Sequence, residues 1–375
     1  MPEFDVVLPI VTQLKSENRD LDIEIAITNE KLYERLRRTP LYMHAIEKNG
    51  IEITTIFRKD LIDRSVARKS IFLRTITRIH SFLCEPYHFI RFFGSMVRAD
   101  IYMHEFTKQM YQVYMLYLMA FWSGKRIYTY NHAGSLNFNT RAKRVSRWGK
   151  SVALSFDERA EGTFHAMGYD TVKTIGHPWF FPAWKSLIVD YAEESGTGRG
   201  HIVIYSRNIH PDCMDADIYE NLHMEAYRAI GEIFGEIRIV VKPHPKEDMT
   251  NLEHIIERSG MGRYIEISNE HPMVLAIGAI VAISLYTSAI LSAIAMGTPA
   301  VEYYRESSNF REREPTGSAY AGIGIRSCSE EEELKSFLIS MKKGEYESPQ
   351  IYERFSGKYD LSPLLIDDTS GEESS

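Results

Sequence analysis

The chain has 375 residues, of which 44% are apolar and 25% are charged, and its formal net charge is −7. These values are ordinary for a soluble globular protein and exclude a disordered, collagen-like or disulfide-rich chain. At about 100–200 residues per domain, the length predicts two domains. Three widely separated cysteines without a Cys-x-x-Cys pair predict a reducing compartment and no cysteine-based zinc site.

The first half of the chain alternates short β-branched runs with longer amphipathic stretches, which predicts an α/β architecture. A strand over residues 5–8 would be very short, and we expect it to be short or missing. The other predicted strands are 21–27, 51–56, 99–104, 126–130, 151–155 and 172–175, and the main predicted helices are 30–48, 105–122 and 157–167.

The second half repeats this scheme. Its predicted strands are 201–205, 238–242, 264–267, 280–283, 299–303 and 322–327, and its predicted helices are 218–234, 251–258, 272–277, 287–296 and 330–342. Because the segment 193–200 reads Glu-Glu-Ser-Gly-Thr-Gly-Arg-Gly, it is typical of a linker. We therefore expect one domain over 1–185, a linker over 186–200, a second domain over 201–365, and an acidic, disordered tail over 366–375.

Charge is divided unevenly between the two halves. Residues 1–185 hold 27 Lys and Arg against 19 Asp and Glu, whereas the rest of the chain is strongly acidic. The basic excess gathers in segments 58–78 and 141–150. Such a face could meet an anionic membrane or an acidic glycan, or it could be an ordinary solvated helix face. The sequence carries no nucleic-acid-binding signature, so we do not expect nucleic acid as a partner.

The sequence also bears on localisation. Residues 1–5 read Met-Pro-Glu-Phe-Asp, unlike the basic and then apolar start of a signal peptide. The longest apolar run, over 111–122, is shorter than the ~20 residues of a spanning helix. We therefore expect a cytoplasmic protein.

The most informative motif is Lys242-Pro243-His244-Pro245, which directly follows the β-branched run 239–241. Lys242 and His244 should lie at the carboxyl end of a buried strand, where parallel sheets bind ligands. Because proline restricts its own backbone and that of the preceding residue, the turn should be stiff. A rigid imidazole there can donate to a phosphate or a sugar hydroxyl, although an incidental histidine at a proline-rich strand exit is the alternative.

A second motif, Ser284-Leu285-Tyr286-Thr287-Ser288, follows another predicted strand and precedes a helix of small residues. We expect Thr287 or Ser288 to be the N-cap of that helix. A helix start offers free N–H groups to an anion, and hydroxyls would add donors, although simple capping explains the same residues. Arg207, in the loop after strand 201–205, is a further candidate phosphate contact.

A third element is the return from that helix to the next strand. Gly297 should end the helix and Pro299 should prevent its continuation. Glu302, on the strand that follows, could bind a ribose hydroxyl or be an edge charge.

Together, these three elements resemble the C-terminal domain of GT-B glycosyltransferases. They are most similar to bacterial enzymes of surface and capsular polysaccharide synthesis that carry a His-Pro motif, namely sialyltransferases, capsule Kdo transferases and CDP-glycerol glycerophosphotransferases. The resemblance covers about residues 200–305, and in the first half it extends to the layout and two loops. It implies a GT-B fold, that is, an α/β protein with two Rossmann-like domains facing a cleft, the first on the acceptor side and the second binding the nucleotide donor.

The resemblance also implies a reaction. A sugar would pass from a CMP-, CDP- or UDP-linked donor to a glycan or lipid-linked acceptor, without a metal ion or a separate cofactor. The basic N-terminal domain would then provide peripheral contact with the inner membrane. The residues expected to bind the nucleotide or its phosphate are Arg207, Lys242, His244, Ser284, Thr287, Ser288 and Glu302.

Candidates for the catalytic base lie in the first half of the chain. His132 follows the strand 126–130 within Asn-His-Ala-Gly-Ser and resembles the His-Gly loop of glycerophosphotransferase-type enzymes, with Ala133 inserted. A neutral histidine can deprotonate an acceptor hydroxyl near pH 7. Asp157 and Glu105 also follow predicted strands and are alternative bases, although Asp157 could instead cap the next helix.

Other functions remain open at this stage. A CDP-glycerol-type glycerophosphotransferase would use the same fold. A hydrolysing UDP-sugar 2-epimerase is less favoured, because its glycine-rich Asp-Ser-Gly-Gly segment is replaced here by 284–288. A non-catalytic nucleotide or glycan binder would keep the fold without turnover.

Overall fold

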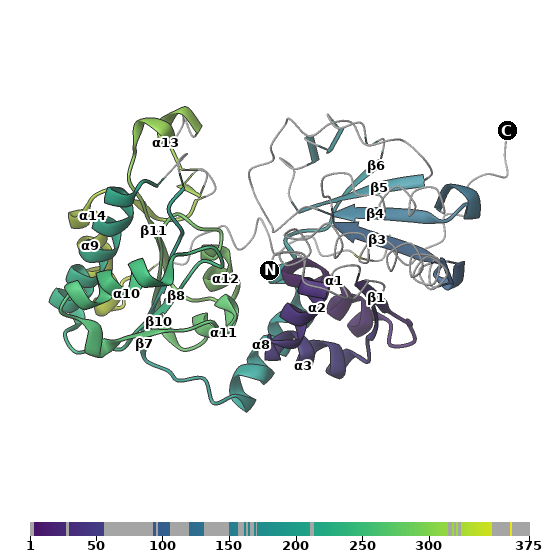
Figure 1. The fold of residues 1–375 in the computed structure, drawn as a ribbon, viewed down its shortest axis with the longest axis horizontal. Helices are drawn as coiled ribbons and strands as arrows, with labels where there is room; N and C mark the ends of the chain where they lie inside the picture. The colour runs from purple at the N-terminus through teal and green to yellow at the C-terminus, as the bar shows by residue number, and fades with distance from the viewer. Residues whose placement is uncertain are drawn as a thin grey trace, which may run out of the picture. The chain divides into compact units, whose positions relative to one another are not determined.

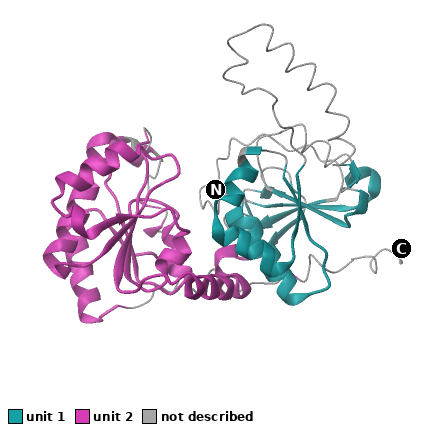
Figure 2. Ribbon diagram, turned by 60° about the horizontal axis from the view of Figure 1, so that its bottom comes forward, with its two compact units in different colours: residues 1–133, 138–175 teal, residues 134–137, 176–375 magenta. Residues whose placement is uncertain are grey.

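The structure is a computed structural model of the chain. It describes residues 4–27, 30–55, 93–94, 97–105, 120–130, 150–156, 161–162, 164–165, 169, 171–210, 214–313, 317–318, 320–321, 324–346 and 361. The chain divides into two compact units, unit 1 with residues 1–133 and 138–175, and unit 2 with residues 134–137 and 176–375 (Figure 2). Both units have the α/β architecture that the sequence predicts.

Unit 1 contains two parallel sheets in its described part, one of order β1-β2 and one of order β3-β4-β5-β6 (Figure 1). Its helices and strands are α1 (Phe4–Glu17), β1 (Glu24–Ile27), α2 (Glu30–Arg37), α3 (Pro40–Asn49), β2 (Glu52–Thr55), β3 (Ile101–Glu105), β4 (Arg126–Tyr130), β5 (Lys150–Ser155) and β6 (Thr171–Thr174).

The start of unit 1 is helical. No strand forms over 5–8, since α1 buries the apolar residues of this segment, such as Leu8 and Ile10, and packs against α3. The single helix predicted over 30–48 is two helices, α2 and α3. Thr39 adopts an extended conformation before Pro40, because proline disfavours a helical residue immediately before it.

Unit 2 is built on one parallel sheet of order β12-β11-β10-β7-β8-β9. Its main helices and strands are α8 (Pro182–Glu194), β7 (His201–Tyr205), α9 (Ala216–Phe234), β8 (Ile239–Lys242), α10 (Met249–Arg258), β9 (Ile265–Ile267), α11 (Pro272–Ala276), β10 (Ala279–Ser284), α12 (Ile290–Ala295), β11 (Ala300–Tyr303), α13 (Ser308–Arg313), β12 (Ser327–Cys328) and α14 (Glu331–Lys343).

Helices cover both faces of this sheet. In Figure 1, α9, α10 and α14 lie on one side of it and α11 and α12 on the other. Every residue of β7 is therefore buried, as the apolar run that follows His201 predicts. Ile202 and Ile204 belong to the apolar core that includes residues of α9, α10 and α14. The Tyr205 hydroxyl donates instead to the carbonyl of Pro272 in α11, at 2.9 Å.

The strand order places a topological switch point beside β7. The chain runs from β7 outward to β8 and β9, then returns to the other side of β7 to form β10. In open parallel sheets, ligands bind outside the carboxyl ends of the strands at such a point. The last strand is the least accurate prediction, since β12 covers only Ser327–Cys328 rather than 322–327.

The division between the units differs from the predicted linker. The boundary falls between Ile175 and Gly176, ten residues before the expected end of the first domain, and much of the expected linker is helix α8. Trp184 explains the difference, because it is fully buried in unit 2. Its indole N–H donates to the sulfur of Met273 at 3.3 Å, and its ring packs edge-on against His271. Only the Gly-rich end of the predicted segment, after Glu194, is turn.

Among the described residues, no helix has the length and apolar character needed to span a membrane. The expected peripheral contact with a membrane depends largely on basic residues of 58–78 and 141–149, which lie outside the described residues.

Replacing Trp184 tests the assignment of α8 to unit 2. We expect Trp184→Ala to lower the free energy of unfolding by about 3–5 kcal/mol, because a large buried side chain is lost and a cavity remains. The control is Trp122→Ala in unit 1, whose side chain is 73% exposed and whose loss should cost less than about 0.5 kcal/mol. Urea unfolding measures both values, and equal losses in the two variants would contradict the assignment.

Candidate functional site

The switch point of unit 2 brings three loops together. The backbone N–H of Ser206, after β7, donates to the carbonyl of Lys242 at the end of β8, at 2.9 Å. The N–H of Leu285, after β10, donates to the carbonyl of Tyr205 at 2.9 Å. Residues 206–208, 243–247 and 285–288, called the switch-point loops below, therefore leave one edge of the sheet side by side. The predicted placement of the Lys-Pro-His-Pro motif at this edge is confirmed.

His244 is held by its own turn. Its backbone N–H donates to Oε2 of Glu247 at 2.6 Å, and its Nδ1 accepts from the N–H of Lys246 at 3.2 Å. In a neutral imidazole whose Nδ1 accepts, the proton is on Nε2, which is then a donor. The ring can therefore present an N–H to an anion without carrying a charge.

Electrostatics keep this ring neutral. Burial, and then the nearby positive charges of Arg207, Lys246 and Lys242, lower the pKa of His244 from 6.5 to about 4. Positive charges that disfavour an imidazolium favour a bound anion at the same place. The loop is thus prepared for a phosphate rather than for a cation.

Arg207 joins two of the switch-point loops. Its Nη1 donates to the carbonyl of Tyr286 at 2.6 Å, and its guanidinium lies 5.0 Å from the centre of the Tyr286 ring. Its buried Nε has no hydrogen-bond partner among the described residues. A guanidinium fixed on one side in this way keeps donors for a second partner, which is the arrangement suited to a phosphate.

Tyr286 has an unusual backbone. Its φ of 52° makes it the one residue other than glycine with positive φ in the described part of the chain. The aromatic rings of Phe310, Tyr304 and Tyr320 surround its buried ring, with the Phe310 centroid at 5.0 Å. A non-glycine residue keeps this conformation only where its surroundings hold it, and such positions gather at functional sites. No feature of the sequence analysis identified Tyr286.

The hydroxyl-bearing loop before α12 differs from the prediction. Neither Thr287 nor Ser288 is the N-cap of α12, which begins at Ile290 with Ala289 in the capping position. Instead, Ser284 closes the loop, because its Oγ accepts from the N–H of Thr287 at 3.1 Å and donates to the Thr287 carbonyl at 2.9 Å. Ser284 is fully buried, so it shapes the loop, whereas the half-buried Ser288 is the more accessible hydroxyl.

Two other predicted phosphate or ribose contacts have partners within the protein. The ammonium of Lys242 donates to the carbonyl of Asn269 at 3.2 Å. Glu302 is fully buried, and its Oε2 accepts from the hydroxyls of Ser318 and Ser327, each at 2.6 Å. Contact of Glu302 with a ribose remains a prediction.

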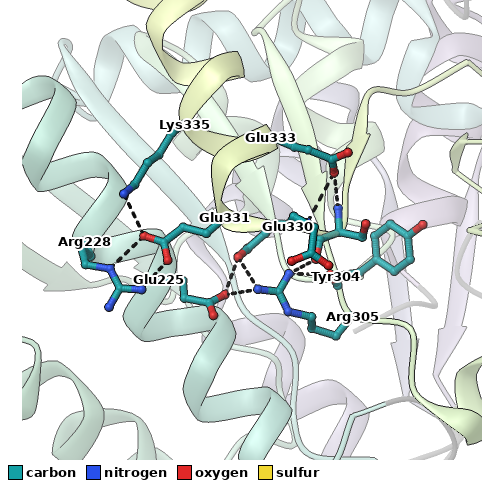
Figure 3. Close-up of polar contacts among 10 residues, drawn as sticks. Glu225, Arg228, Tyr304, Arg305, Glu330, Glu331, Glu333 and Lys335 are labelled. Carbon is teal, nitrogen blue, oxygen red and sulfur yellow. Dashed lines mark hydrogen bonds and ion pairs between the residues drawn. The ribbon is translucent and has the colours of Figure 1, made fainter.

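Arg305 extends the same edge of the sheet but is bound by neighbouring elements. Its guanidinium forms an ion pair with Glu225 of α9 and donates to the carbonyl of Ser329. Figure 3 shows this group beside a second one in which Glu331 of α14 joins Arg228 of α9 and Lys335. These contacts fasten α14 to α9, and they leave Arg207 as the better-placed arginine for a ligand.

Glu247 is a residue of the site that the sequence analysis missed. One carboxyl oxygen accepts from the His244 N–H, and the other contacts the hydroxyls of Ser206 and Tyr219. The signal in the sequence was its spacing, since Glu247 stands three residues after His244, within reach of the backbone N–H of the same turn.

Of the three predicted bases in unit 1, the structure describes one, Glu105. Glu105 is the last residue of β3 and pairs with Tyr130 of β4. His132 and Asp157 lie outside the described residues. The strands that precede them are β4 and β5. β4 pairs with β3 and β5 pairs with β4, all in parallel, so the three strands end at the same edge of the unit 1 sheet.

Comparisons with known proteins give a fold and no family. No family model and no curated protein matches the chain. Among solved structures, a candidate UDP-N-acetylglucosamine 2-epimerase from Listeria monocytogenes is 12% identical over 100% of this chain and 95% of its own, with a TM-score of 0.53.

Two further solved structures are similar to the chain. UDP-GlcNAc 2-epimerase from Neisseria meningitidis, bound to UDP-GlcNAc, is 12% identical over 97% of this chain and 95% of its own, with a TM-score of 0.52. The wall teichoic acid polymerase TagF, 11% identical over 95% and 90% of the two chains, has a TM-score of 0.49, which is too low to support an argument. Identities this low establish the fold alone, and that fold is the predicted GT-B class with two Rossmann-like domains.

The titration of His244 tests the electrostatics of the site. We expect its imidazole to titrate near pH 4 in the free protein, and Arg207→Met to raise that pKa, because a nearby positive charge is removed. The shift should be partial, since burial is the larger cause and remains. Histidine NMR titration measures both values, with His244→Gln assigning the signal.

Arg238→Met is the control for this titration, because Arg238 pairs with Glu266 at the opposite end of β8. An ordinary pKa near 6.5 for His244 in the parent protein would contradict the expected electrostatics. Since the unfolded chain binds this proton near pH 6.5 and the folded protein does not, His244 should also reduce stability as pH falls from 6.5 towards 4.

Proposed function

We propose that the protein is an enzyme acting on a nucleotide-activated sugar, and more specifically a metal-independent glycosyltransferase that passes the sugar to a surface-glycan acceptor. The observation that carries this proposal is the convergence of Arg207, His244 and the 287–288 loop at the switch point of the unit 2 sheet. In GT-B enzymes with a His-Pro motif, that motif holds the nucleotide phosphate. This chain has the GT-B fold.

The chemistry of the loops suits a departing nucleotide diphosphate. When the bond from sugar to phosphate breaks, negative charge develops on the phosphate oxygen. Arg207 and Lys242 supply positive charge, and the Nε2–H of His244 supplies a neutral donor. Donors that are already oriented for the developing charge lower the barrier most, because they need no reorganisation during the reaction. We infer that the enzyme needs no metal ion, because the positive charges of Arg207 and Lys242 can themselves neutralise the leaving group.

The transfer also needs a base for the acceptor hydroxyl. We propose His132 for this role, with Asp157 and Glu105 as alternatives, since Glu105 ends β3 and the other two follow β4 and β5 of the same parallel sheet. The base would remove the hydroxyl proton as the oxygen attacks the anomeric carbon. A glycan or lipid-linked acceptor, brought by peripheral membrane contact of the basic N-terminal domain, completes the proposal.

Two of the solved structures with TM-scores above 0.5 raise one alternative. Both are described as UDP-GlcNAc 2-epimerases, and one of them was solved with UDP-GlcNAc bound. Uridine nucleotides are therefore the first to test, and a hydrolysing 2-epimerase is the second candidate. Tyr286 stands in the loop that is glycine-rich in that family, and for this reason we favour transfer. A glycerophosphotransferase or a non-catalytic binder would use the same phosphate site.

Nucleotide binding tests the phosphate site. We expect UDP, CDP, CMP or GDP to raise the melting temperature of the protein, because a ligand that binds only the folded state stabilises it. His244→Ala and Arg207→Met should each weaken binding about tenfold or more, since each removes a hydrogen bond to a charged group. Calorimetry measures the affinities, and Arg238→Met is the matched control. Unchanged affinity in both site variants would contradict the proposed site.

Turnover separates the candidate functions. We expect CMP-, CDP- or UDP-linked donors to be consumed faster when an acceptor glycan is present, and His132→Ala to slow consumption by about 100-fold or more, because the base is lost. Mass spectrometry of the products tells transfer from release of a 2-epimerised free sugar. Equal rates for parent and variant would contradict the role of His132, and binding without turnover would favour a non-catalytic protein.

A further inference from the structure

A buried polar cluster lies directly behind two of the switch-point loops. It consists of Ser206, Tyr219, His223 and Glu247, of which the first three are at most 3% exposed. Ser206 Oγ lies 2.8 Å from Nε2 of His223 and also contacts Oε1 of Glu247. The Tyr219 hydroxyl donates to the same Oε1 at 2.6 Å.

This cluster connects the two loops that carry the proposed phosphate ligands. Ser206 immediately precedes Arg207 in the loop after β7. Glu247 accepts the backbone N–H of His244 through Oε2, at 2.6 Å. Any change in the contact between Ser206 and Glu247 therefore alters the positions of both Arg207 and His244.

The tautomer of His223 follows from its second nitrogen. Nδ1 lies 2.7 Å from the carbonyl oxygen of Tyr219, which can only accept, so Nδ1 carries a proton. In a neutral imidazole with a protonated Nδ1, Nε2 is an acceptor. Ser206 has a single hydroxyl proton, and it faces two atoms, this Nε2 and the Glu247 carboxyl oxygen.

Counting protons shows that one more is needed. If Glu247 were ionised and His223 neutral, the Ser206 proton could serve only one of its two contacts, and the other would bring lone pairs together in a buried place. With a proton on the carboxyl group, Glu247 donates to Ser206 and Ser206 donates to Nε2. With the proton on the imidazole instead, Nε2 donates to Ser206 and Ser206 donates to Glu247. Either arrangement gives every contact a proton.

We propose that Glu247 and His223 share one proton through Ser206, and that Glu247 in this protonated pair is the positioning residue for the turns that carry His244 and Arg207. The proposal rests on the proposed function only where it assigns phosphate binding to these turns. When the shared proton leaves to solvent at alkaline pH, Ser206 donates to the ionised carboxylate of Glu247, which is the stronger acceptor. Its contact with Nε2 of His223 is then lost, and the loop after β7 is released from α9.

The surroundings determine where the proton is held. Burial lowers the pKa of His223, while hydrogen bonding to Tyr219 and the charge of Glu247 raise it. The groups beside the pair are Tyr219 and Tyr227 of α9, Lys246 and Asp248, which line the same cavity as Glu247, and His244, whose backbone N–H contacts Glu247. Glu247 also lines a cavity of about 180 Å³, which gives the proton a route to solvent.

Spectroscopy on the free protein tests the shared proton directly. We expect at pH 7 either two protonated nitrogens on His223 in ¹⁵N NMR, or the infrared carbonyl stretch of a protonated carboxyl group that disappears in Glu247→Gln. A His223 protonated only at Nδ1, together with no such carboxyl band, would overturn the proposal. This measurement needs no nucleotide, so its result can be interpreted even if the proposed function is wrong.

Binding measurements test the positioning role. Glu247→Ala should weaken the affinity for UDP about tenfold or more, because the turns that carry His244 and Arg207 lose the carboxyl group that holds them together, and tenfold corresponds to about one hydrogen bond. Glu247→Gln should recover most of that loss, since its amide N–H donates to Ser206 as a protonated carboxyl group would. The affinity of the parent for UDP should fall at alkaline pH. This alkaline limb of the pH profile should be absent from Glu247→Gln.

Glu253→Ala, on the exposed face of α10, is the control and should keep both the affinity and the alkaline limb. A Glu247→Gln variant as weak as Glu247→Ala, or one that retains the alkaline limb, would contradict the positioning role. If no nucleotide binds to the parent, the proposed function fails while the spectroscopic result still decides whether the proton is shared.

Discussion

The pairing of β8 and β10 on opposite sides of β7 is the constraint on which the site depends. Adjacent parallel strands lie about 4.8 Å apart, so three loops leave the sheet within about 10 Å of one another. Arg207 and Tyr286, which are 79 positions apart in the chain, thereby share one edge. The hydrogen bond from Arg207 to the Tyr286 carbonyl then fixes the first of these loops to the third. Without this strand order, neither the arginine nor the His-Pro turn would face a common ligand.

Within this frame, electrostatics select the ligand. The site gathers positive side chains around an imidazole that stays neutral, which is unfavourable for a cation and favourable for an anion. The acidic side chains Glu302 and Glu225 form structural contacts within the protein. Glu302 accepts from two serines, and Glu225 is paired with Arg305, so neither opposes an incoming phosphate with an exposed charge. The switch-point loops thus gather positive side chains in a half of the chain that is acidic overall.

Backbone conformation makes a second contribution. Tyr286 occupies a left-handed conformation that glycine adopts at no cost, and aromatic packing holds it there. In this conformation the Tyr286 carbonyl accepts a hydrogen bond from Arg207, and the Tyr286 ring lies against the guanidinium. A glycine in this place would supply the carbonyl without the ring. The loop is therefore specialised for this chain rather than a general property of the sheet.

Local sequence determined the elements and the position of the motif. Apolar β-branched runs defined strands such as β4 and β7 to the residue, and the stiff Lys-Pro-His-Pro turn followed from proline geometry. Only the tertiary structure decided that Trp184 belongs to unit 2, that Ser284 closes its loop in place of a helix cap, and that Glu247 anchors His244. The burial of Trp184 depends on contact with a distant segment, which no local pattern encodes. The contacts of Ser284 with its loop and of Glu247 with His244 span only three residues, but the same sequence also permits a helix cap or a free carboxylate, and the surrounding fold decided between these possibilities. Short-range propensity sets where a strand ends, whereas packing and hydrogen bonding across the fold decide which side chains meet there.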